Sequence, residues 1–327
     1  MRTAAIIRIV CWSIVIVVLA GIVFMGVNGG FSYFDLPFIS IGNPGFEGTV
    51  STTGSESVNA ADISNIEIDW TAGKVGISAY DGSEIKFTQT SNRSIEDKDR
   101  MVYKVEAGKL RVRDGDGQRK YGFISFGNKN STDLTMWIPA NIYLSALDVS
   151  VVSASASVSG VTLGRINIDG VSGGITVYNI ISEEARFDTV SGEITAEGIE
   201  IGNLKSDSVS GSAAFYGTMK KLNYSSVSGA VKLEGSVNEA RCDTTSGSVE
   251  ISSSVCPGYI SASTVSGSVT IAIPDNDGFT LSYDKVSGSL SNDFPTTESG
   301  GRKIYGNGSA DFNIDTVSGG LNIRKLG

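Results

Sequence analysis

The sequence predicts an all-β protein whose second half is a single-stranded β-solenoid, or β-helix-like stack, with coils of about 19 residues. Three observations support this fold class. The phrase Val-Ser-Gly returns at a nearly fixed interval, and apolar residues alternate with polar ones on both sides of it. The chain also has 40 Gly but only 6 Pro, which suits tight turns between strands whose amide donors are all needed.

The first element is a hydrophobic segment. Residues 1–8 include Arg2 and Arg8, and residues 9–27 are strongly apolar and long enough to cross a bilayer core of ~30 Å. Basic residues before this segment, and none just after it, predict that residues 1–8 are cytoplasmic and that the rest of the chain is extracytoplasmic. A cleaved signal peptide is the alternative, but VFMGVNGG offers no good cleavage site. We therefore expect a retained single-pass anchor in the cell membrane.

A linker and the first strands follow the anchor. Residues 28–60 form a juxtamembrane segment and a linker rich in Gly, Ser and Thr, which is typical of a flexible tether. From residue 61 the apolar residues alternate, so that residues 61–148 are predicted to be an antiparallel or irregular β region. Within that region, a hairpin is expected to bring two pairs of apolar residues face to face: Tyr103 and Val105 against Leu110 and Val112.

The repeats occupy residues 149–327. The corner serines are Ser172, Ser191, Ser210, Ser228, Ser246, Ser266, Ser287 and Ser318, at intervals of 19, 19, 18, 18, 20, 21 and 31 residues. A period near 20 indicates a solenoid in which each coil buries its apolar face against the next. The long last interval predicts an inserted loop within residues 291–310, before the final repeat closes the stack.

Alternation on both sides of each corner predicts which side chains point inward. In three consecutive coils these are Ala185, Phe187, Val190, Ile194, Ala196 and Ile199, then Leu204, Ser206, Val209, Ala213, Phe215 and Met219, then Leu222, Tyr224, Val227, Val231, Leu233 and Val237. The corner valine is thus expected to point into the core, while Ser-Gly turns the chain. The glycine supplies backbone freedom, and the serine hydroxyl is expected to bond neighbouring backbone.

Composition excludes several kinds of chemistry. The chain has no His, so it contains no Ser-His-Asp triad, no His-ligated metal and no imidazole acid or base. A net charge of −9 argues against a nucleic-acid partner. The segment 170–174, GVSGG, matches a nucleophile elbow, but that motif requires a following helix and a histidine. Parallel β-helix enzymes that act on carbohydrates build clefts from long loops, whereas these coils are short. We therefore expect no enzyme activity.

The three cysteines lack the spacing of a metal site. Cys11 lies in the hydrophobic segment, whereas Cys242 falls at an inward strand position and is predicted to be a buried free thiol. A disulfide between Cys242 and Cys256 is the alternative.

An acidic column is the strongest candidate for a ligand site. Two residues before each corner valine or its equivalent stand Asp169, Asp188, Asp207, Ser225, Asp243, Ser263, Asp284 and Asp315. Stacked coils would align these side chains ~5 Å apart, a spacing at which calcium would relieve the repulsion between carboxylates. The alternative is that they cap turns, which Ser225 and Ser263 favour because serine caps well but is a poor charged ligand. We therefore expect no bound cofactor, with a calcium ladder as the competing hypothesis.

Two segments stand outside the repeat and are candidate binding surfaces. They are Ser291–Ala310 and the aromatic stretch Lys120–Asn130. The alternative for both is an exposed hairpin tip.

The chain resembles the putative-adhesin family of bacterial domains of unknown function over residues 63–323. The resemblance rests on the order of several phrases: ISNIEIDWTAGKVGI, MWIPANIYLSALDV, the serial VSGSV, VSGEI and TSGSV corners, IAIPDNDGFTLSYDKVSGSL, and GNGSADFNIDTVSGGLNI. It implies a β-solenoid-like domain, often anchored to a membrane, with no established activity and no catalytic residues to assign.

These observations together predict a non-enzymatic, membrane-anchored envelope protein with an adhesin-like interaction or structural domain. Its partner would be a protein or a glycan at the cell envelope. One alternative is a sensory or regulatory component that acts through a membrane partner, because only about eight residues precede the anchor. Another is a self-assembling scaffold that associates by strand addition at uncapped ends. A glycan-acting enzyme is the least supported alternative.

Overall fold

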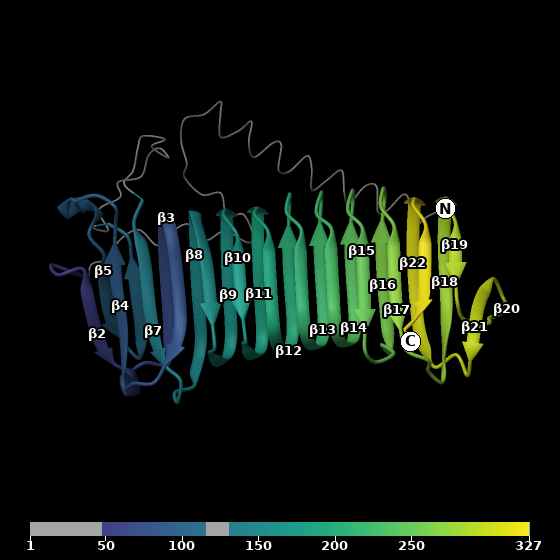
Figure 1. Ribbon diagram of the computed structural model, residues 1–327, viewed down its shortest axis with the longest axis horizontal. Coiled ribbons are helices and arrows are strands. Elements are labelled where there is room, and N and C mark those ends of the chain that lie inside the picture. The colour runs from purple at the N-terminus through teal and green to yellow at the C-terminus, as the bar shows by residue number, and fades with distance from the viewer. Residues whose placement is uncertain (1–47, 116–130, 327) are drawn as a thin grey trace, which may run out of the picture. The chain divides into compact units, whose positions relative to one another are not determined.

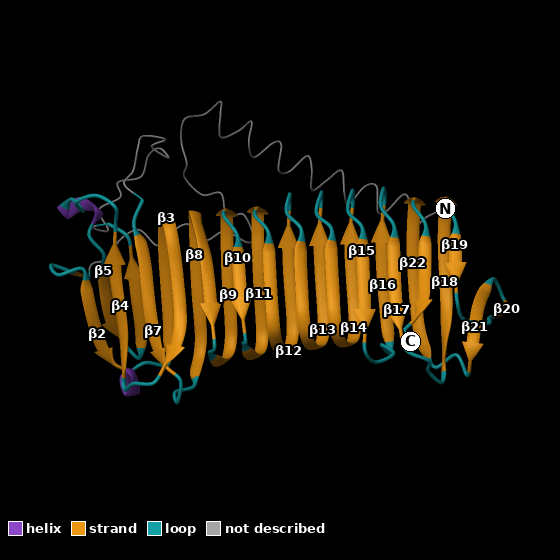
Figure 2. Ribbon diagram, in the orientation of Figure 1, coloured by secondary structure: helices purple, strands orange, loops and turns teal. Residues whose placement is uncertain are grey.

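Strands make up nearly all regular structure in this computed structural model, which describes residues 48–115 and 131–326 (Figure 2). Within those ranges the helical elements are two short 3-10 turns, η1 (Ala60–Asp62) and η2 (Asp97–Asp99). The all-β prediction is confirmed. The predicted anchor at residues 9–27 lies outside the described residues, and none of the helices inside them has the length and apolar character needed to cross a bilayer.

The described chain divides into two compact units, with the boundary in the sequence between residues 196 and 197 inside β12 (Ile194–Ser208). The first unit contains β1 to β11, and the second contains β13 to β23. Each unit is a stack of parallel coils, so the β-solenoid-like fold expected from the repeat holds for both.

The first unit is built around β3 (Asn65–Tyr80), which forms a whole coil by itself. On one side β3 pairs in parallel with β8 (Leu144–Ser159), and on the other with β6 (Lys109–Arg113) and β7 (Asp133–Pro139) (Figure 1). This region was predicted to be antiparallel or irregular, and β3 differs because alternation reveals which face a side chain takes but not which strands lie beside it.

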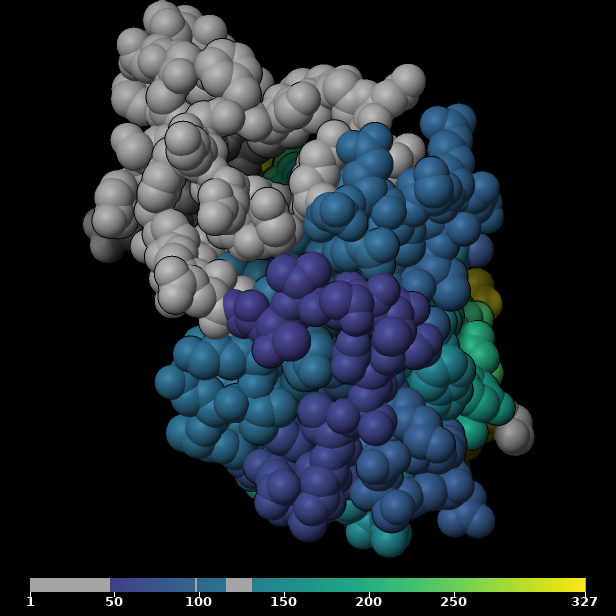
Figure 3. All heavy atoms as spheres, turned by 90° about the vertical axis from the view of Figure 1, so that its left-hand side faces the viewer, coloured from purple at the N-terminus to yellow at the C-terminus, as the bar shows by residue number. Residues whose placement is uncertain are grey.

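Antiparallel strands cap this unit beyond β6 and β7. They are β4 (Glu84–Thr90) on β7, β5 (Val102–Glu106) on β6, β2 (Ser55–Asn59) on β4 and β1 (Thr49–Val50) on β5. The predicted hairpin is confirmed, with Tyr103 opposite Val112 and Val105 opposite Leu110. Figure 3 looks onto this end, where the first described residues, in purple, face the viewer. The cap covers the coil edge that would otherwise invite strand addition.

The remaining coils of the first unit stack in register. They comprise β8, β9 (Thr162–Ser172), β10 (Ile175–Tyr178) and β11 (Ile181–Ser191), with β9 and β10 pairing with β8, and β11 pairing with β9. Ser191 lies beside Ser172, so one sequence period of 19 residues is one coil.

The second unit continues the repeat but not its sequence order. Its first coils are β13 (Ala213–Ser226), β14 (Val231–Thr244), β15 (Val249–Ser253), β16 (Tyr259–Thr264) and β17 (Val269–Ile273), all in parallel register. The next coil in space is the last one in sequence, β22 (Ala310–Ser318) with β23 (Leu321–Lys325). In Figure 1 the yellow β22 accordingly stands between β16 and β18, which are greener.

The outermost coil is formed by β18 (Gly278–Ser287) and β19 (Leu290–Asn292), which pair with β22 and β23. The long last interval contains the hairpin β20 (Thr297–Ser299) and β21 (Arg302–Gly306), and β21 pairs antiparallel with β18. The prediction of an inserted segment is confirmed. The prediction that the final repeat closes the stack is wrong. After the inserted hairpin, the chain returns to form β22 and β23 inside the stack, and β18 and β19 remain the outermost coil.

The core follows the predicted alternation except at the corners. Phe187, Phe215 and Tyr224 are buried, as expected. The corner valines Val190, Val209 and Val227 are only half-buried, and the buried residue is the one before each of them: Thr189, Ser208 and Ser226. Alternation continues to that position, so its hydroxyl enters the core and the valine turns away from it.

These inward hydroxyls bond the backbone of the corner. Thr244 Oγ1 donates to the carbonyl of Gly247 at 2.7 Å, and Ser208 Oγ donates to that of Gly211 at 2.9 Å. The amide of Gly229 in turn donates to Ser226 Oγ at 2.8 Å. The corner serine itself, such as Ser228 or Ser246, is exposed instead. At these three corners the backbone is therefore bonded by the residue two positions earlier than the sequence suggested, whereas the buried hydroxyl of Thr189 has no hydrogen-bond partner within the described residues.

Candidate binding surfaces

In each unit, residues of the predicted acidic column lie side by side on neighbouring strands. In the first unit Asp188 lies beside Asp169. In the second unit Ser225 lies beside Asp243, followed by Ser263, Asp315 and Asp284, so Asp315 precedes Asp284 in space.

The carboxylates of the column occupy different environments. Asp188 is only 2% exposed and binds Arg186 at 2.5 Å, while Asp207 pairs with Lys205 at 3.0 Å. Burial, followed by the charge of Asp188, raises the pKa of Asp169 to about 7. Burial likewise raises the pKa of Asp243 and Asp315. Among residues 48–115 and 131–326, no three carboxylates or thiols gather in a group that could hold a metal ion. The calcium and turn-capping roles of these side chains both stay predictions.

Both cysteines in the second unit are free thiols. Cys242 is fully buried, as predicted, and burial raises the pKa of its thiol. Cys256 lies half-buried in the turn between β15 and β16. The alternative disulfide between them is therefore wrong.

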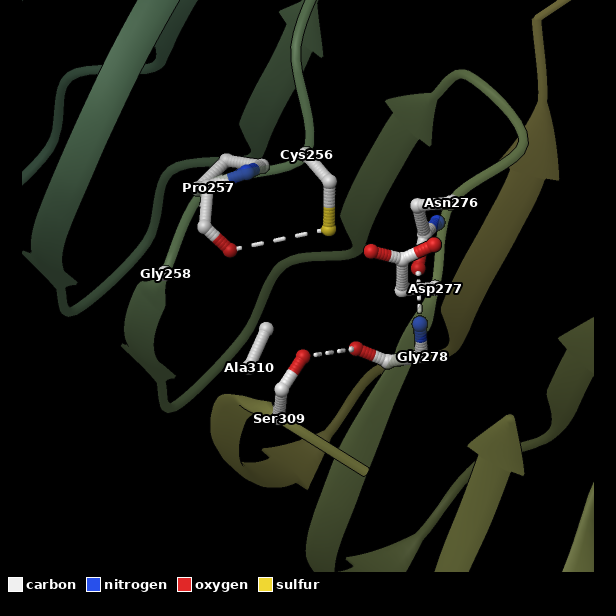
Figure 4. A pocket seen from close by; sticks show the side chains of 8 residues that line it. All are labelled: Cys256, Pro257, Gly258, Asn276, Asp277, Gly278, Ser309 and Ala310. Atoms are coloured by element: carbon white, nitrogen blue, oxygen red, sulfur yellow. Dashed lines mark hydrogen bonds between the residues drawn. The ribbon is translucent and has the colours of Figure 1, made fainter. Parts of the chain in front are cut away.

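A hollow of about 340 Å³ opens beside Cys256 (Figure 4). Three turns build it: β15–β16, β17–β18 and β21–β22. They come together because β22 is inserted between β16 and β18. The residues that line it are Cys256, Pro257, Gly258, Asn276, Asp277, Gly278, Ser309 and Ala310. The predicted binding segment Ser291–Ala310 thus contributes its last two residues to a concave surface.

Hydrogen bonds fix the rim of this hollow. Asn276 Oδ1 accepts from the amide of Gly278 at 3.0 Å, and Ser309 Oγ donates to the carbonyl of Gly278 at 3.3 Å. Gly278 has φ +148°, and a Cβ there would lie 2.3 Å from the carbonyl oxygen of Tyr305. Only glycine fits this position.

The hollow is better suited to binding than to catalysis. Burial raises the pKa of the Cys256 thiol, which keeps it protonated and weakly nucleophilic near neutral pH. The chain has no histidine, so no imidazole stands beside this thiol.

The base of the inserted hairpin is held by aromatic packing. The ring of Phe279 lies 5.3 Å from that of Phe294, 5.6 Å from that of Tyr305 and 4.9 Å from that of Phe312. The hydroxyl of Tyr305 also donates to Asp275 at 2.8 Å. The hairpin is therefore anchored at its base, and only its tip is the exposed turn that the alternative interpretation expected. The other predicted surface, Lys120–Asn130, lies outside the described residues.

One sheet edge of the second unit remains open within the described chain. β21 covers β18 only from Gly278 to Leu281, and no described strand pairs with the outer side of β18 beyond that point or of β19. Val286 on this edge is 70% exposed.

Comparison with known proteins places this architecture. The family model described as Toastrack DUF4097 matches residues 63–324. A solved Parabacteroides distasonis structure described as a "putative adhesin" shares 13% identity, with 84% of this chain and 97% of that chain covered and a TM-score of 0.51, which shows the fold alone. A second structure from the same organism, described as a "putative lipid binding protein", shares 17% identity over 86% of this chain and 99% of that chain, with a TM-score of 0.47. No curated protein matches the chain.

Proposed function

The chain belongs to the Toastrack DUF4097 family, and from this premise we propose that it is a non-enzymatic interaction module at the cell envelope, of the adhesin-like kind. The proposal takes its direction from the P. distasonis structure of the same fold, which is described as a "putative adhesin". The partner we propose is a protein or a glycan outside the membrane.

The observation that carries the proposal is the hollow beside Cys256. Three turns from successive repeats build a concave surface of about 340 Å³, with a hydroxyl, an amide and a carboxylate on its rim. Concave sites with a few fixed polar groups are typical of binding. A thiol that burial keeps protonated gives the same surface little nucleophilic capacity, which favours an interaction module over a glycan-acting enzyme.

The proposed anchor is the apolar segment 9–27, with residues 1–8 in the cytoplasm. External protease applied to intact cells that produce the full chain should remove the β domain and leave a small membrane fragment. Full protection of the β domain, or its release without protease, would contradict this topology.

The function is tested by attachment. A bacterial host that displays the full chain should attach to mucin-coated plates, or aggregate, more than cells with an empty vector. Ser309→Tyr, which fills the hollow, should return attachment to the vector level, whereas Ser299→Tyr at the exposed hairpin tip should not. Attachment at the vector level with the unmodified chain displayed would contradict the proposal.

A self-assembling scaffold is the second candidate, and the open edge of β18 and β19 favours it. Unpaired strand edges are templates for another strand. Sedimentation velocity of the full chain should then show oligomers that grow with concentration. Val286→Lys, which places a charge on the edge, should shift the protein to monomer. Identical sedimentation of the two proteins at all concentrations would exclude this function.

A further inference from the structure

A second concave surface lies in the first unit, remote in sequence from the hollow beside Cys256. It is a groove of about 480 Å³ across four neighbouring coils. The pairing register places Asn65 of β3 beside Ala146 of β8, then Arg165 of β9, then Glu184 of β11. Tyr143, directly before β8, lies in the same groove.

The side chain of Tyr143 is held against the groove yet remains open to solvent. A Cβ built on Gly164 would lie 2.9 Å from the Tyr143 hydroxyl oxygen and 2.9 Å from the carbonyl oxygen of Ser145. The hydroxyl end of Tyr143 therefore reaches over the space that a side chain at residue 164 would fill. Tyr143 is nevertheless 57% exposed, which leaves much of its ring available to a ligand.

The polar groups around this ring include both donors and acceptors. Glu183 and Glu184 are exposed, and no cation among residues 48–115 and 131–326 pairs with either carboxylate. Arg165 supplies guanidinium donors and lies 3.6 Å from Asp148. Asn65 adds an amide, which both donates and accepts.

We propose that this groove binds a neutral saccharide unit, an inference that rests on the proposed interaction function and names its ligand class. A sugar ring presents a face of C–H groups, which packs on an aromatic ring, and a rim of hydroxyls, each of which donates and accepts. Tyr143 supplies the ring, and the acid, guanidinium and amide groups supply the rim.

The charges of the groove disfavour the other ligand classes. An anion such as phosphate would meet Glu183 and Glu184. A cationic side chain would be attracted by those carboxylates and by the tyrosine ring, but it would also meet the guanidinium of Arg165. A neutral ligand rich in hydroxyls uses all of these groups at once. The volume lies within the range of ~300–1,000 Å³ that is typical of small-molecule sites.

The test is saturation-transfer NMR on the full chain with glucose, galactose, mannose and N-acetylglucosamine. The detergent must be zwitterionic, because maltoside and glucoside detergents present sugars themselves. At least one of the four sugars should bind with a Kd of about 1–10 mM. Tyr143→Ala should weaken binding about tenfold or more, because it removes the stacking surface, and Tyr143→Phe should stay within about twofold of the unmodified chain.

Tyr178→Ala is the matched control, since Tyr178 is also about half exposed, at 51%, but does not line the groove. It should bind like the unmodified chain, and all variants should melt at the same temperature as that chain. The proposal is overturned if none of the four sugars binds, if Tyr143→Ala binds as well as the unmodified chain, or if only a trilysine peptide binds. This readout does not involve cell attachment. If the sugar binds but the cells do not attach, the saccharide site in the groove is supported and only the adhesin-like function is contradicted.

Discussion

Asp188 lies directly beside Asp169 on the neighbouring strand, and it is Asp188 that carries the ion pair with Arg186. The two carboxylates therefore share one nearby cation. Burial and the charge of Asp188 raise the pKa of Asp169 to about 7, with Asp148 adding to the shift and Arg186 opposing it. This pair makes stability depend on pH near neutrality.

A raised pKa means that the folded state binds the proton of Asp169 more tightly than the unfolded chain does. The contribution of Asp169 to stability is therefore fully present below the unfolded pKa, near 4, and is lost as the pH rises through about 7. Asp169→Asn should stabilise the protein at pH 8 by about 1–3 kcal/mol and flatten the dependence of the unfolding free energy between pH 5 and 8. Urea denaturation at several pH values checks this. A variant with the same slope as the unmodified chain would rule the pair out as its source.

The inward hydroxyl at each corner should matter more than the serine of the motif. Thr244→Val removes the bond to the Gly247 carbonyl at 2.7 Å and the bond that the Gly247 amide donates to Thr244 Oγ1 at 3.3 Å, and a buried amide that loses its acceptor costs about 1–3 kcal/mol. Ser246→Ala, at the exposed corner position, should change the unfolding free energy by less than about 0.5 kcal/mol. Denaturant curves of the two variants decide between the residues, and equal effects would refute the assignment.

The corner glycines should be needed for space. A Cβ on Gly229 would lie 2.0 Å from the carbonyl oxygen of Gly211 in the adjacent coil, so Gly229→Ala must push coils apart and should cost about 3 kcal/mol or more. The control is Gly258→Ala, where the nearest atom is the carbonyl oxygen of Asn238 at 3.9 Å. Similar melting temperatures for the two variants would contradict this packing.

Calcium should not stabilise the protein. Asp188 and Asp207 already pair with Arg186 and Lys205, and the raised pKa of Asp169 keeps much of that carboxyl protonated at neutral pH. The melting temperature of the full chain should therefore differ by less than about 1 °C between millimolar calcium and chelator. A rise of several degrees would instead establish the acidic column as a metal ladder.

The sequence was sufficient to predict the coil length, the Tyr103–Val112 hairpin and most of the core, because alternation and period act locally. The sequence also contains a pattern that indicates which hydroxyl bonds the corner backbone, and the prediction did not use it. A hydroxyl residue precedes the corner position at Thr189, Ser208, Ser226, Thr244, Thr264 and Thr316.

Other features depend on which coils become neighbours, and no local pattern specifies this. The positions of β3 and β22 in their stacks arise in this way. So does the groove at Tyr143, which requires Gly164 of the following coil to lie beneath the tyrosine hydroxyl.

The placement of β22 and β23 also constrains how the chain is synthesised and folded. The ribosome synthesises β18 and the hairpin before β22 and β23, which lie between β16 and β18 in the folded unit. The second unit therefore cannot add its coils one after another in sequence order during translation. The outer coil must wait, or bind first and be displaced, until residues 310–325 emerge. A chain that ends before residue 310 would lack the coil on which β18 and β19 pair, so we expect late truncations to be cleared by proteolysis.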